Sequence, residues 1–444
     1  MNEIGASICG APNGGIAFGP WAEGTSTSVH VQVSCPPGMD FLGIYHCLPP
    51  WEYIYTPGYG SLPAEEAYQY WLPNAEKHEA DRLIELTLSH GGKLTVTPNH
   101  PLLVHGHWLP AELVIPSEKV RYETHLPVEE FQKLPLPTYR STTPWRIKHR
   151  PAIPETMTPE LGEFLGLIWS DGHISQGSHG WRTSFTNTDE RLLERAYFLA
   201  EDLFGLEAHQ GQWVVYWDAT LLSRWIVKDL GFTKRRVPKV IWSAGESSRQ
   251  AFLDGVIAGD GSINPASPSK PGNLVTAIST GVEHQAAVSL AYLCATLGIK
   301  ARIRQMPQNW QKRKHDYMYQ VTFQSGERQV QVISQVVAED IVRDAQTGRF
   351  SAGNQSGSHF TGGKTITDDV VWVRSVREIN QPTMVYDFHT SDQILYAGSI
   401  PIITHNTHPG GVAQPSAQDM KSGLAVNAKH LCISADGDLR CYRK

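Results

Sequence analysis

The pattern of hydrophobic and polar positions changes twice along this chain. Up to about residue 115, apolar residues fall in short runs between Gly and Pro, such as SVHVQVSC, RLIELTLSH and KLTVTPNHPLLVHG, as is typical of strands. Longer helix-like segments follow, including PELGEFLGLIWSDG, DERLLERAYFLAEDLF, ATLLSRWIVKDLG, SRQAFLDGVIAGDG and HQAAVSLAYLCATLG. Strand-like runs return in DVVWVRSVREI and TMVYDFHT. We therefore expect a β region that is interrupted by an α-rich insert and then resumes, with a Pro-rich linker near 133–159.

Length and composition fit a globular protein of several domains. A chain of 444 residues corresponds to about three domains. No apolar run reaches the roughly 18 residues needed to cross a bilayer, and the start lacks the features of a signal peptide, so we expect a soluble, cytoplasmic protein with no membrane partner. The six cysteines show no CxxC spacing, which argues against a disulfide scaffold and against a cysteine zinc site.

The charge is unevenly distributed. The whole chain has a net charge of -6, whereas residues 140–345 carry a slight excess of Lys and Arg, so the middle is where a nucleic-acid partner is expected. The basic runs TKRRVPKVI (233–241) and QKRKHDYMYQVTF lie there, and either could face phosphates. Each run taken alone is equally consistent with a solvated surface.

The α-rich insert contains a degenerate repeat. FLGLIWSDG (164–172) and FLDGVIAGDG (252–261) each end in Asp-Gly, which makes Asp171 and Asp260 equivalent. A single copy would be read as a core helix ending at a Gly cap. Two copies, each opening a unit of roughly 90 residues, indicate an internal repeat.

These runs resemble the motif of the LAGLIDADG homing endonucleases. The resemblance implies an α/β fold in which two motif helices pack at a pseudo-twofold axis, with Asp171 and Asp260 meeting where Mg²⁺ and the scissile phosphates of double-stranded DNA are bound. Carboxylates suit this role because Mg²⁺ prefers oxygen ligands. Lys234 is the expected basic residue near the phosphates, with Arg235 or Arg236 as alternatives. The expected target is the uninterrupted host gene at the insertion site.

The flanks of the insert carry four further motifs in order. They are CLPPWEYIYTPGYGSL (47–62), TVTPNHPLLV (95–104), VYDFHTSDQILYAG (385–398) and ITHN followed by Thr. Each alone means little, but together they resemble the blocks of the all-β Hint domain of an intein covering 47–406. By this resemblance the splicing residues are Cys47, Thr97, His100, Asp387, His405, Asn406 and Thr407.

The resemblance implies self-splicing without a cofactor. Cys47 would attack the carbonyl of His46 and form a thioester, since a thiol is intrinsically nucleophilic. Thr97 would hold the strained bond and His100 would protonate the departing nitrogen. The thioester would then pass to the hydroxyl of Thr407, and cyclisation of Asn406, assisted by the preceding histidine, would release the insert.

One position departs from the intein pattern. The family usually has a histidine shortly after the block aspartate, but alignment on Ala397-Gly398 places Gln393 there, and His389 comes too early. We therefore expect slower cyclisation of Asn406, or help for His405 from another group.

Joining the flanks creates a metal-binding motif. His46 would be followed by Thr407-His408 and then by PSAQD, giving HxH…SxxD spacing that resembles the JAMM/MPN (JAB domain) zinc metallopeptidases, an α/β fold. In isolation an HxH pair would be read as a surface feature. The resemblance implies three Zn²⁺ ligands with a fourth position for water, and a peptide or ubiquitin-like conjugate as substrate. The implied residues are His46, His408 and Asp419 for Zn²⁺, Ser416 for the tetrahedral intermediate and Glu3 as base.

The predicted fold is multidomain, and two other functions compete with splicing. The expected parts are a split host domain at 1–46 and 407–444, a Hint domain at 47–145 and 351–406, and the LAGLIDADG endonuclease at 146–350. One alternative is a non-splicing DNA endonuclease whose β flanks bind DNA. The other is Hedgehog-like autoprocessing, which needs neither the terminal Asn nor the nucleophile after it.

Overall fold

The computed structural model describes most of the chain between Cys47 and His405. The described ranges are 47–72, 74–131, 133–140, 150–177, 180–267, 270–307, 317–326, 329, 369–390 and 394–405, together with the backbone of short strands nearer the two ends. The chain divides into two compact units. Unit 1 comprises Met1–Tyr55, Leu62–Glu123 and Val370–Lys444, and unit 2 comprises Thr56–Ser61 and Thr124–Asp369.

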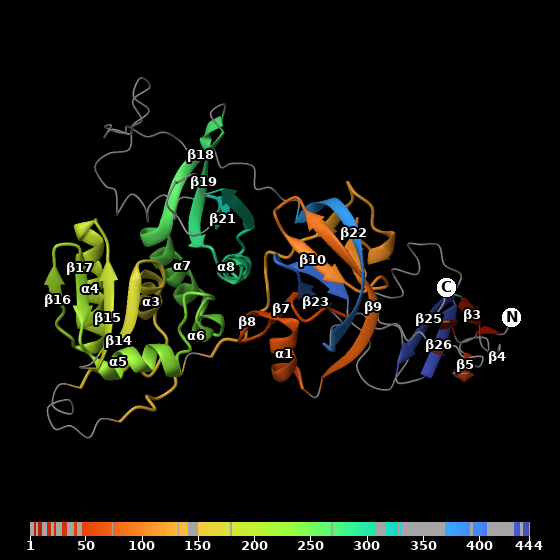
Figure 1. Ribbon diagram of the computed structural model, residues 1–444, viewed down its shortest axis with the longest axis horizontal. Helices are drawn as coiled ribbons and strands as arrows, with labels where there is room; N and C mark the ends of the chain where they lie inside the picture. Colours follow the sequence, from red (N-terminus) through yellow and green to blue (C-terminus); the bar gives the residue numbers. More distant parts are fainter. Residues whose placement is uncertain are drawn as a thin grey trace. The chain divides into compact units, whose positions relative to one another are not determined.

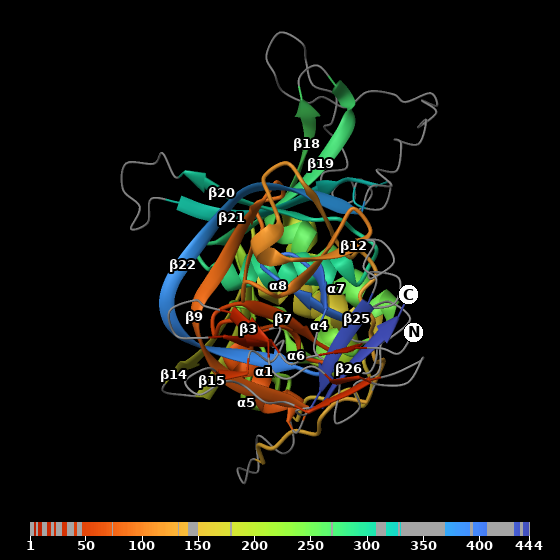
Figure 2. The same ribbon diagram turned by 90° about the vertical axis from the view of Figure 1, so that its right-hand side faces the viewer.

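Between residues 47 and 405, unit 1 consists mainly of β strands. Its sheet has the order β10-β9-β22-β13-β11-β24-β23-β7-β8, and β12 pairs with β11. The two longest strands, β9 (Ala75–Leu88) and β22 (Val370–Phe388), pair antiparallel from Ala75↔Phe388 to Leu88↔Val373 and curve together in Figure 2. The other strands are β7 (Tyr53–Thr56), β8 (Gly60–Pro63), β10 (Lys93–Val96), β11 (Pro101–Val104), β12 (His107–Pro110), β13 (Lys119–Arg121), β23 (Ile394–Ala397) and β24 (Ile402–His405).

The apolar positions of this sheet account for its core. Alternating burial along β11 and β23 places every second side chain inside, as expected of a half-buried strand. All four residues of β24 are buried. One helix, α1 (Ala64–Trp71), and one 3-10 turn, η1 (Ala111–Leu113), complete the described part of the unit between residues 47 and 405.

Strands from the two ends of the chain share a sheet. β5 (Val29–Gln32) pairs antiparallel with β26 (Asp438–Arg443), which pairs with β25 (His430–Ala435). Two smaller pairings lie within the N-terminal flank, where β2 (Ile8–Gly10) pairs with β3 (Ile16–Phe18) and β6 (Asp40–Phe41), and β1 (Ile4–Gly5) pairs with β4 (Ala22–Glu23). The flanks are thus joined by backbone hydrogen bonds across the whole intervening segment.

Unit 2 is built from two α/β halves with the same topology. Each half runs helix, two strands, helix, two strands, and the sheets have the matching orders β14-β15-β17-β16 and β18-β19-β21-β20 (Figure 1). This confirms the internal repeat predicted from the sequence. The first half comprises α3 (Pro159–Ser170), β14 (Gly172–Gly177), β15 (Gly180–Thr186), α4 (Glu190–Phe204), β16 (His209–Gly211) and β17 (Val214–Trp217). The second comprises α7 (Glu246–Asp260), β18 (Gly261–Ser267), β19 (Lys270–Gly281), α8 (His284–Ala295), β20 (Arg302–Pro307) and β21 (Tyr317–Gln324).

Local sequence signals set the helix ends. The side chain of Thr158 accepts a hydrogen bond from the Leu161 N–H, and Pro159 occupies the first turn of α3, as is typical of a helix start. α4 ends at Gly205, which adopts the left-handed conformation that glycine permits. The segment ATLLSRWIVKDLG forms α5 (Thr220–Arg224) continued by a π-helical turn (Trp225–Asp229), and α6 (Lys239–Trp242) precedes α7.

The first helices of the two halves pack backbone against backbone (Figure 1). A Cβ added at Gly166 would lie 2.2 Å from the Phe252 carbonyl oxygen, and one added at Gly255 would lie 2.5 Å from the Glu163 carbonyl oxygen. Any larger residue at these two positions would push α3 and α7 apart. The glycines of the repeat therefore hold the carboxyl ends of both helices close together.

The described residues of the Pro-rich stretch near 133–159, namely 133–140 and 150–159, contact other parts of unit 2, which corrects their interpretation as a linker. Trp225 Nε1 donates to the Pro135 carbonyl at 2.8 Å, and the Thr138 N–H donates to Asp229 Oδ2 at 3.2 Å. Prolines lack an N–H but keep a carbonyl acceptor, so the stretch can lie as an extended strap on unit 2. The division between the units falls after Glu123, earlier than the expected boundary at 145/146.

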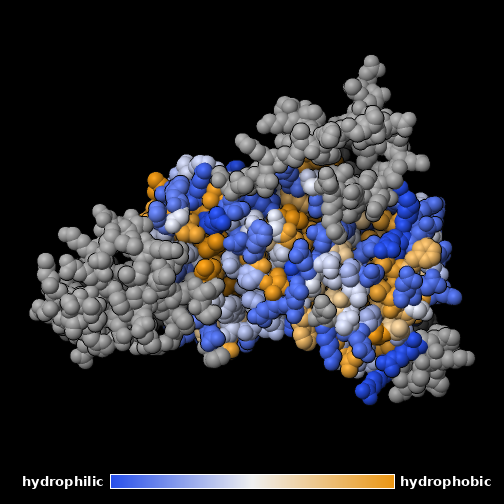
Figure 3. Space-filling view, turned by 180° about the vertical axis from the view of Figure 1, so that it is seen from behind, coloured by the Kyte–Doolittle hydropathy of each residue, from blue (hydrophilic) through white to orange (hydrophobic). Residues whose placement is uncertain are grey.

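The described surface is mixed in polarity. Hydrophilic and hydrophobic residues are interspersed over the face shown in Figure 3. Among the described residues, no helix has the length and apolar character needed to cross a membrane.

Candidate functional site

Two carboxylates stand at the ends of the packed helices. Asp171 directly follows α3 and Asp260 is the last residue of α7. The pKa of Asp260 is raised to about 6, mainly by burial and also by the negative charge of Asp171, whereas the Lys234 ammonium lowers it. Burial also raises the pKa of Asp171, against a hydrogen bond from Asn187 and the charge of Lys234. The two acids thus form one electrostatically coupled cluster.

The structure places Lys234 in this cluster. Its Nζ donates to the Ser170 carbonyl at 2.6 Å. Burial lowers the pKa of the amine, whereas Asp260 and then Asp171 raise it. Of the two alternatives, Arg235 directs its Nε to Glu283 at 3.9 Å, and the Arg236 carbonyl accepts from Trp169 Nε1 at 3.2 Å. The charge of Lys234 acts on both acids and lowers the pKa of each.

The donor set suits a hard cation that also binds oxygens from outside the protein. Mg²⁺ is usually held by one or two carboxylates, with water and phosphate oxygens completing its shell. Asp171 and Asp260 provide such a pair. In the described ranges no group of three or more His, Cys, Asp or Glu side chains is arranged to hold a metal ion, so a closed protein cage is not formed there.

The raised pKa of Asp260 should make the free energy of unfolding depend on pH. The raised pKa of Asp260 means that its charged form is disfavoured in the fold, so the charge costs stability above about pH 6 and the cost disappears as the pH falls below about 4. Without divalent cations, Asp260→Asn should raise the free energy of unfolding at pH 8 by about 1–3 kcal/mol. The gain should vanish at pH 4 in chemical denaturation.

A matched control separates this effect from a general one. Glu246 is exposed on the same helix, and Glu246→Gln should give no such gain at pH 8. An Asp260→Asn gain of equal size at both pH values would contradict the argument.

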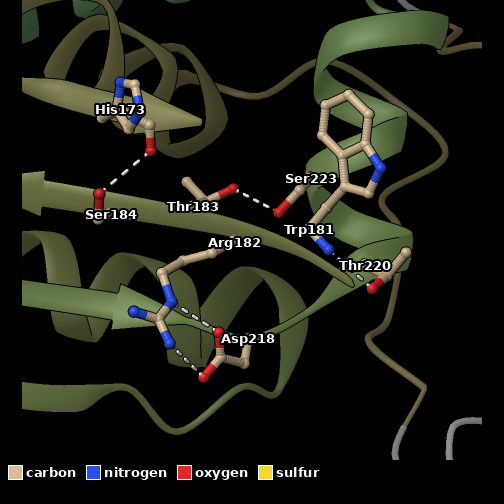
Figure 4. A network of polar contacts seen from close by, with 8 residues as sticks. All are labelled: His173, Trp181, Arg182, Thr183, Ser184, Asp218, Thr220 and Ser223. Carbon is tan, nitrogen blue, oxygen red and sulfur yellow. Dashed lines mark hydrogen bonds and ion pairs between the residues drawn. The ribbon is translucent and has the colours of Figure 1, made fainter. Parts of the chain in front are cut away.

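The sheets of unit 2 present polar faces away from their helices. Along β15, Thr183 is buried, and its hydroxyl shares a hydrogen bond of 2.8 Å with the Ser223 hydroxyl. Arg182 and Ser184 lie on the other face of the strand (Figure 4). Arg182 is engaged by Asp218 through two hydrogen bonds of 2.7 and 3.0 Å and lies over the Tyr216 ring. In the other half, the exposed Arg302 and Arg304 occupy alternate positions of β20 and so share one face.

A second group of predicted residues meets around Cys47 in unit 1. The Cys47 N–H donates to Thr97 Oγ1 at 3.2 Å, and the Thr97 N–H donates to the Cys47 carbonyl at 3.1 Å. Burial raises the pKa of the Cys47 thiol, and the charges of Asp387 and Glu76 raise it further. At neutral pH the buried thiol is therefore protonated, and its attack on a carbonyl requires loss of that proton.

The predicted histidines, His100 and His405, lie at neighbouring ends of two paired strands. The His100 N–H donates to the Thr97 carbonyl at 3.0 Å, and β11 begins at the next residue. β11 pairs antiparallel with β24 at Leu102↔Thr404, so His405 lies across from the neighbour of His100. Both histidines are buried. The remaining sequence-predicted residues lie outside the described ranges: His46, Gln393, Asn406, Thr407, Glu3, His408, Ser416 and Asp419.

One residue that the sequence analysis set aside, His389, and two that it missed, Glu52 and Asn187, have contacts near these sites. His389 Nε2 lies 3.6 Å from Asp387 Oδ2; alternation along an extended strand could have paired them. Glu52 is buried and accepts from the Thr95 N–H, and burial raises its pKa to about 8. Asn187 donates to Asp171. Nothing in the local sequence marks Glu52 or Asn187.

Comparison with known proteins bears on unit 2. Residues 247–336 match the model of a family described as a LAGLIDADG-like domain. These residues belong to that family. The LAGLIDADG-like match starts within α7 and spans the second αββαββ half, including Asp260, and the first half repeats the same order of elements.

Two curated relatives and two solved structures are similar over part of the chain. The replication factor C small subunit of Thermococcus kodakarensis is 26% identical over 271 residues, covering 59% of this chain and 26% of that protein. An A-type ATP synthase subunit of Pyrococcus horikoshii is 24% identical over 347 residues, covering 73% of this chain and 32% of that protein. The chain thus spans about a quarter to a third of their length. Two structures of the homing endonuclease I-DmoI, one in complex with its target DNA in the presence of Mg, are 14% identical over 41% of this chain, with TM-scores of 0.26 and 0.27; they cover 90% and 97% of the I-DmoI chains.

Proposed function

We propose that unit 2 is a Mg²⁺-dependent homing endonuclease that cuts double-stranded DNA at one specific site. The observation that carries this proposal is the pair of coupled carboxylates, Asp171 and Asp260, at the ends of two helices that begin the repeated halves. A duplex also has two strands related by a twofold axis, so one acid from each half suits one scissile phosphate on each strand.

The residues of the cluster have distinct roles in this proposal. Asp171 and Asp260 would each hold Mg²⁺ for one strand, and the bound metal would polarise the scissile phosphate of that strand and activate a water. Lys234, whose ammonium lies near both acids, would stabilise negative charge on the phosphate. The polar sheet faces, with Arg302 and Arg304 on one of them, would contact the DNA on either side.

We further propose that residues 47–406 form an intein that excises itself. In the first step Cys47 Sγ bonds to the His46 carbonyl carbon, the amide C–N bond breaks, and the thiol proton is lost as the departing nitrogen gains one from His100. Thr97 would hold the Cys47 amide, and the reciprocal hydrogen bonds between these two residues support that role. Asp387, whose negative charge raises the pKa of the Cys47 thiol, would take part in the same step.

Two further steps complete the reaction. The Thr407 hydroxyl attacks the thioester and Cys47 leaves as a thiol, which gives a branched ester. The side-chain nitrogen of Asn406 then attacks the backbone carbonyl carbon of the same residue. This step releases the Thr407 amine, and His405 would assist it. Transfer of the acyl group from oxygen to this amine leaves His46 joined to Thr407.

The similar proteins support a mobile insert. A replication factor and an ATP synthase have different functions by name, yet a component of each matches a stretch of this chain. The longer match takes in 73% of the chain, which is more than unit 2 contains, so it includes part of the β unit as well. A segment shared by proteins of different function is what an insert present in several hosts would produce.

We also propose that the joined flanks form a JAMM-type zinc metallopeptidase. The ligands would be His46, His408 and Asp419, with Ser416 and Glu3 in catalysis, and the substrate would be a peptide or a ubiquitin-like conjugate. These residues lie outside the described ranges. The proposal rests on their spacing and on the pairing of β5 with β26, which joins the two flanks in one sheet.

One experiment tests the two main proposals together. Mass spectrometry of the expressed protein should detect residues 1–46 joined to 407–444, together with the free 47–406 segment. The protein should linearise a plasmid that carries the uninterrupted host sequence, only with Mg²⁺, and should spare the same plasmid with the insert coding sequence present. A chain that stays intact would favour a permanent fusion, and a plasmid that stays uncut would contradict the endonuclease proposal.

A further inference from the structure

The two acids of the repeat are held differently, although the two halves share one topology. Asn187, between β15 and α4, donates through Nδ2 to Asp171 Oδ2 at 2.8 Å. Its Oδ1 accepts from the Asp189 N–H at 2.8 Å, and its own N–H donates to the Trp213 carbonyl. Because Oδ1 faces a backbone donor, the amide can only point its Nδ2 at Asp171.

The corresponding position in the second half makes no such contact. Gly172 lies opposite Phe185 in β14–β15, and Gly261 lies opposite Ile278 in β18–β19, so Thr280 stands where Asn187 stands. Its Oγ1 donates instead to the Tyr319 carbonyl at 3.3 Å.

Within the described part of the chain, no donor hydrogen-bonds to the Asp260 carboxylate. The nearby positive charge is that of Lys234. Asp260 raises the pKa of the Lys234 amine more than Asp171 does. Both acids are influenced by the charge of Lys234, and among the described residues only Asp171 also accepts a side-chain hydrogen bond, from Asn187.

We infer that Asn187 is a positioning residue that makes the two halves of the endonuclease unequal; this inference rests on the proposed DNA cleavage. Holding Oδ2 fixes the Asp171 carboxylate and leaves Oδ1 to bind a cation. The cation at Asp171 is then bound more tightly, and the DNA strand served by that half is cut faster. Residues that orient a metal ligand in this way typically change affinity or rate by about ten- to hundredfold.

The test follows the two strands separately. A duplex containing the uninterrupted host sequence carries a different fluorophore on each strand, and the full chain cuts it under single-turnover conditions with Mg²⁺. The wild type should cut the strands at unequal rates. Asn187→Ala should slow the faster strand by about ten- to hundredfold and leave the slower strand nearly unchanged.

Two matched variants isolate the contact. Asn187→Asp keeps an acceptor for the Asp189 N–H but loses the donor to Asp171, so it should behave like Asn187→Ala if positioning, not loop folding, is the cause. Thr280→Ala changes the equivalent residue of the other half and should leave both strand rates unchanged.

Binding of Mn²⁺, which shares the preference for carboxylate oxygens, gives a readout independent of cleavage. Electron paramagnetic resonance of the DNA-free chain should show that Asn187→Ala weakens the tighter site by about tenfold or more, and that Thr280→Ala does not. Equal slowing of both strands, or Mn²⁺ binding unchanged in Asn187→Ala, would overturn the inference. A wild type that cuts neither strand would instead refute the proposed function.

Discussion

Replacing either Asp171 or Asp260 with Ala should abolish double-strand cleavage of DNA while leaving splicing intact. Asp171 stands at the end of α3 and Asp260 at the end of α7, so under the proposed mechanism the loss of either leaves one scissile phosphate without a cation ligand. The cleavage rate should fall by more than about a hundredfold, since even residues that only orient a metal ligand cost about ten- to hundredfold. Conversion of supercoiled plasmid to linear product measures the effect.

Nicked plasmid would be informative in this experiment. If one acid serves each strand, a single substitution should leave at most a slow nick and no linear product. Glu246→Gln, which removes an exposed acid from the same helix, should cut at the wild-type rate. Full linearisation by Asp171→Ala would disprove the role of that residue. Loss of splicing in both acid variants would show that the two units are not independent.

The repeat was the most predictable part of the structure. Each motif run is a buried helix that ends at an Asp-Gly pair, and periodicity together with the 89-residue offset between Asp171 and Asp260 marks both copies. The glycines that allow the close approach lie within the same motifs. Local signals were sufficient here because the helices, their ends and their acids are all encoded within a few residues.

Contacts between distant segments were not predictable in the same way. Asn187 reaches Asp171 only through the pairing of β14 with β15, and an isolated Asn in a turn carries no signal of that partner. The Pro-rich strap read as a linker because prolines favour extended backbone, and its docking depends on donors such as Trp225 nearly a hundred residues away. His389 was passed over because alignment by family spacing favoured Gln393, whereas the strand places His389 beside Asp387.

The last expectation concerns the nucleophile of splicing. Cys47→Ala should abolish joining of 1–46 to 407–444, because in the proposed mechanism the Cys47 thiol, whose amide N–H donates to Thr97, starts the reaction. Cleavage after Asn406 would then be the one bond break left. Asn406→Ala should accumulate a thioester or branched species that an added thiol cleaves. Cys294→Ala is the matched control, since Cys294 is equally buried and burial also raises its thiol pKa. Because Cys294 lies in α8 of unit 2, the variant chain should splice normally. Mass spectrometry resolves each product, and joined flanks from the Cys47→Ala chain would show that another residue starts the reaction.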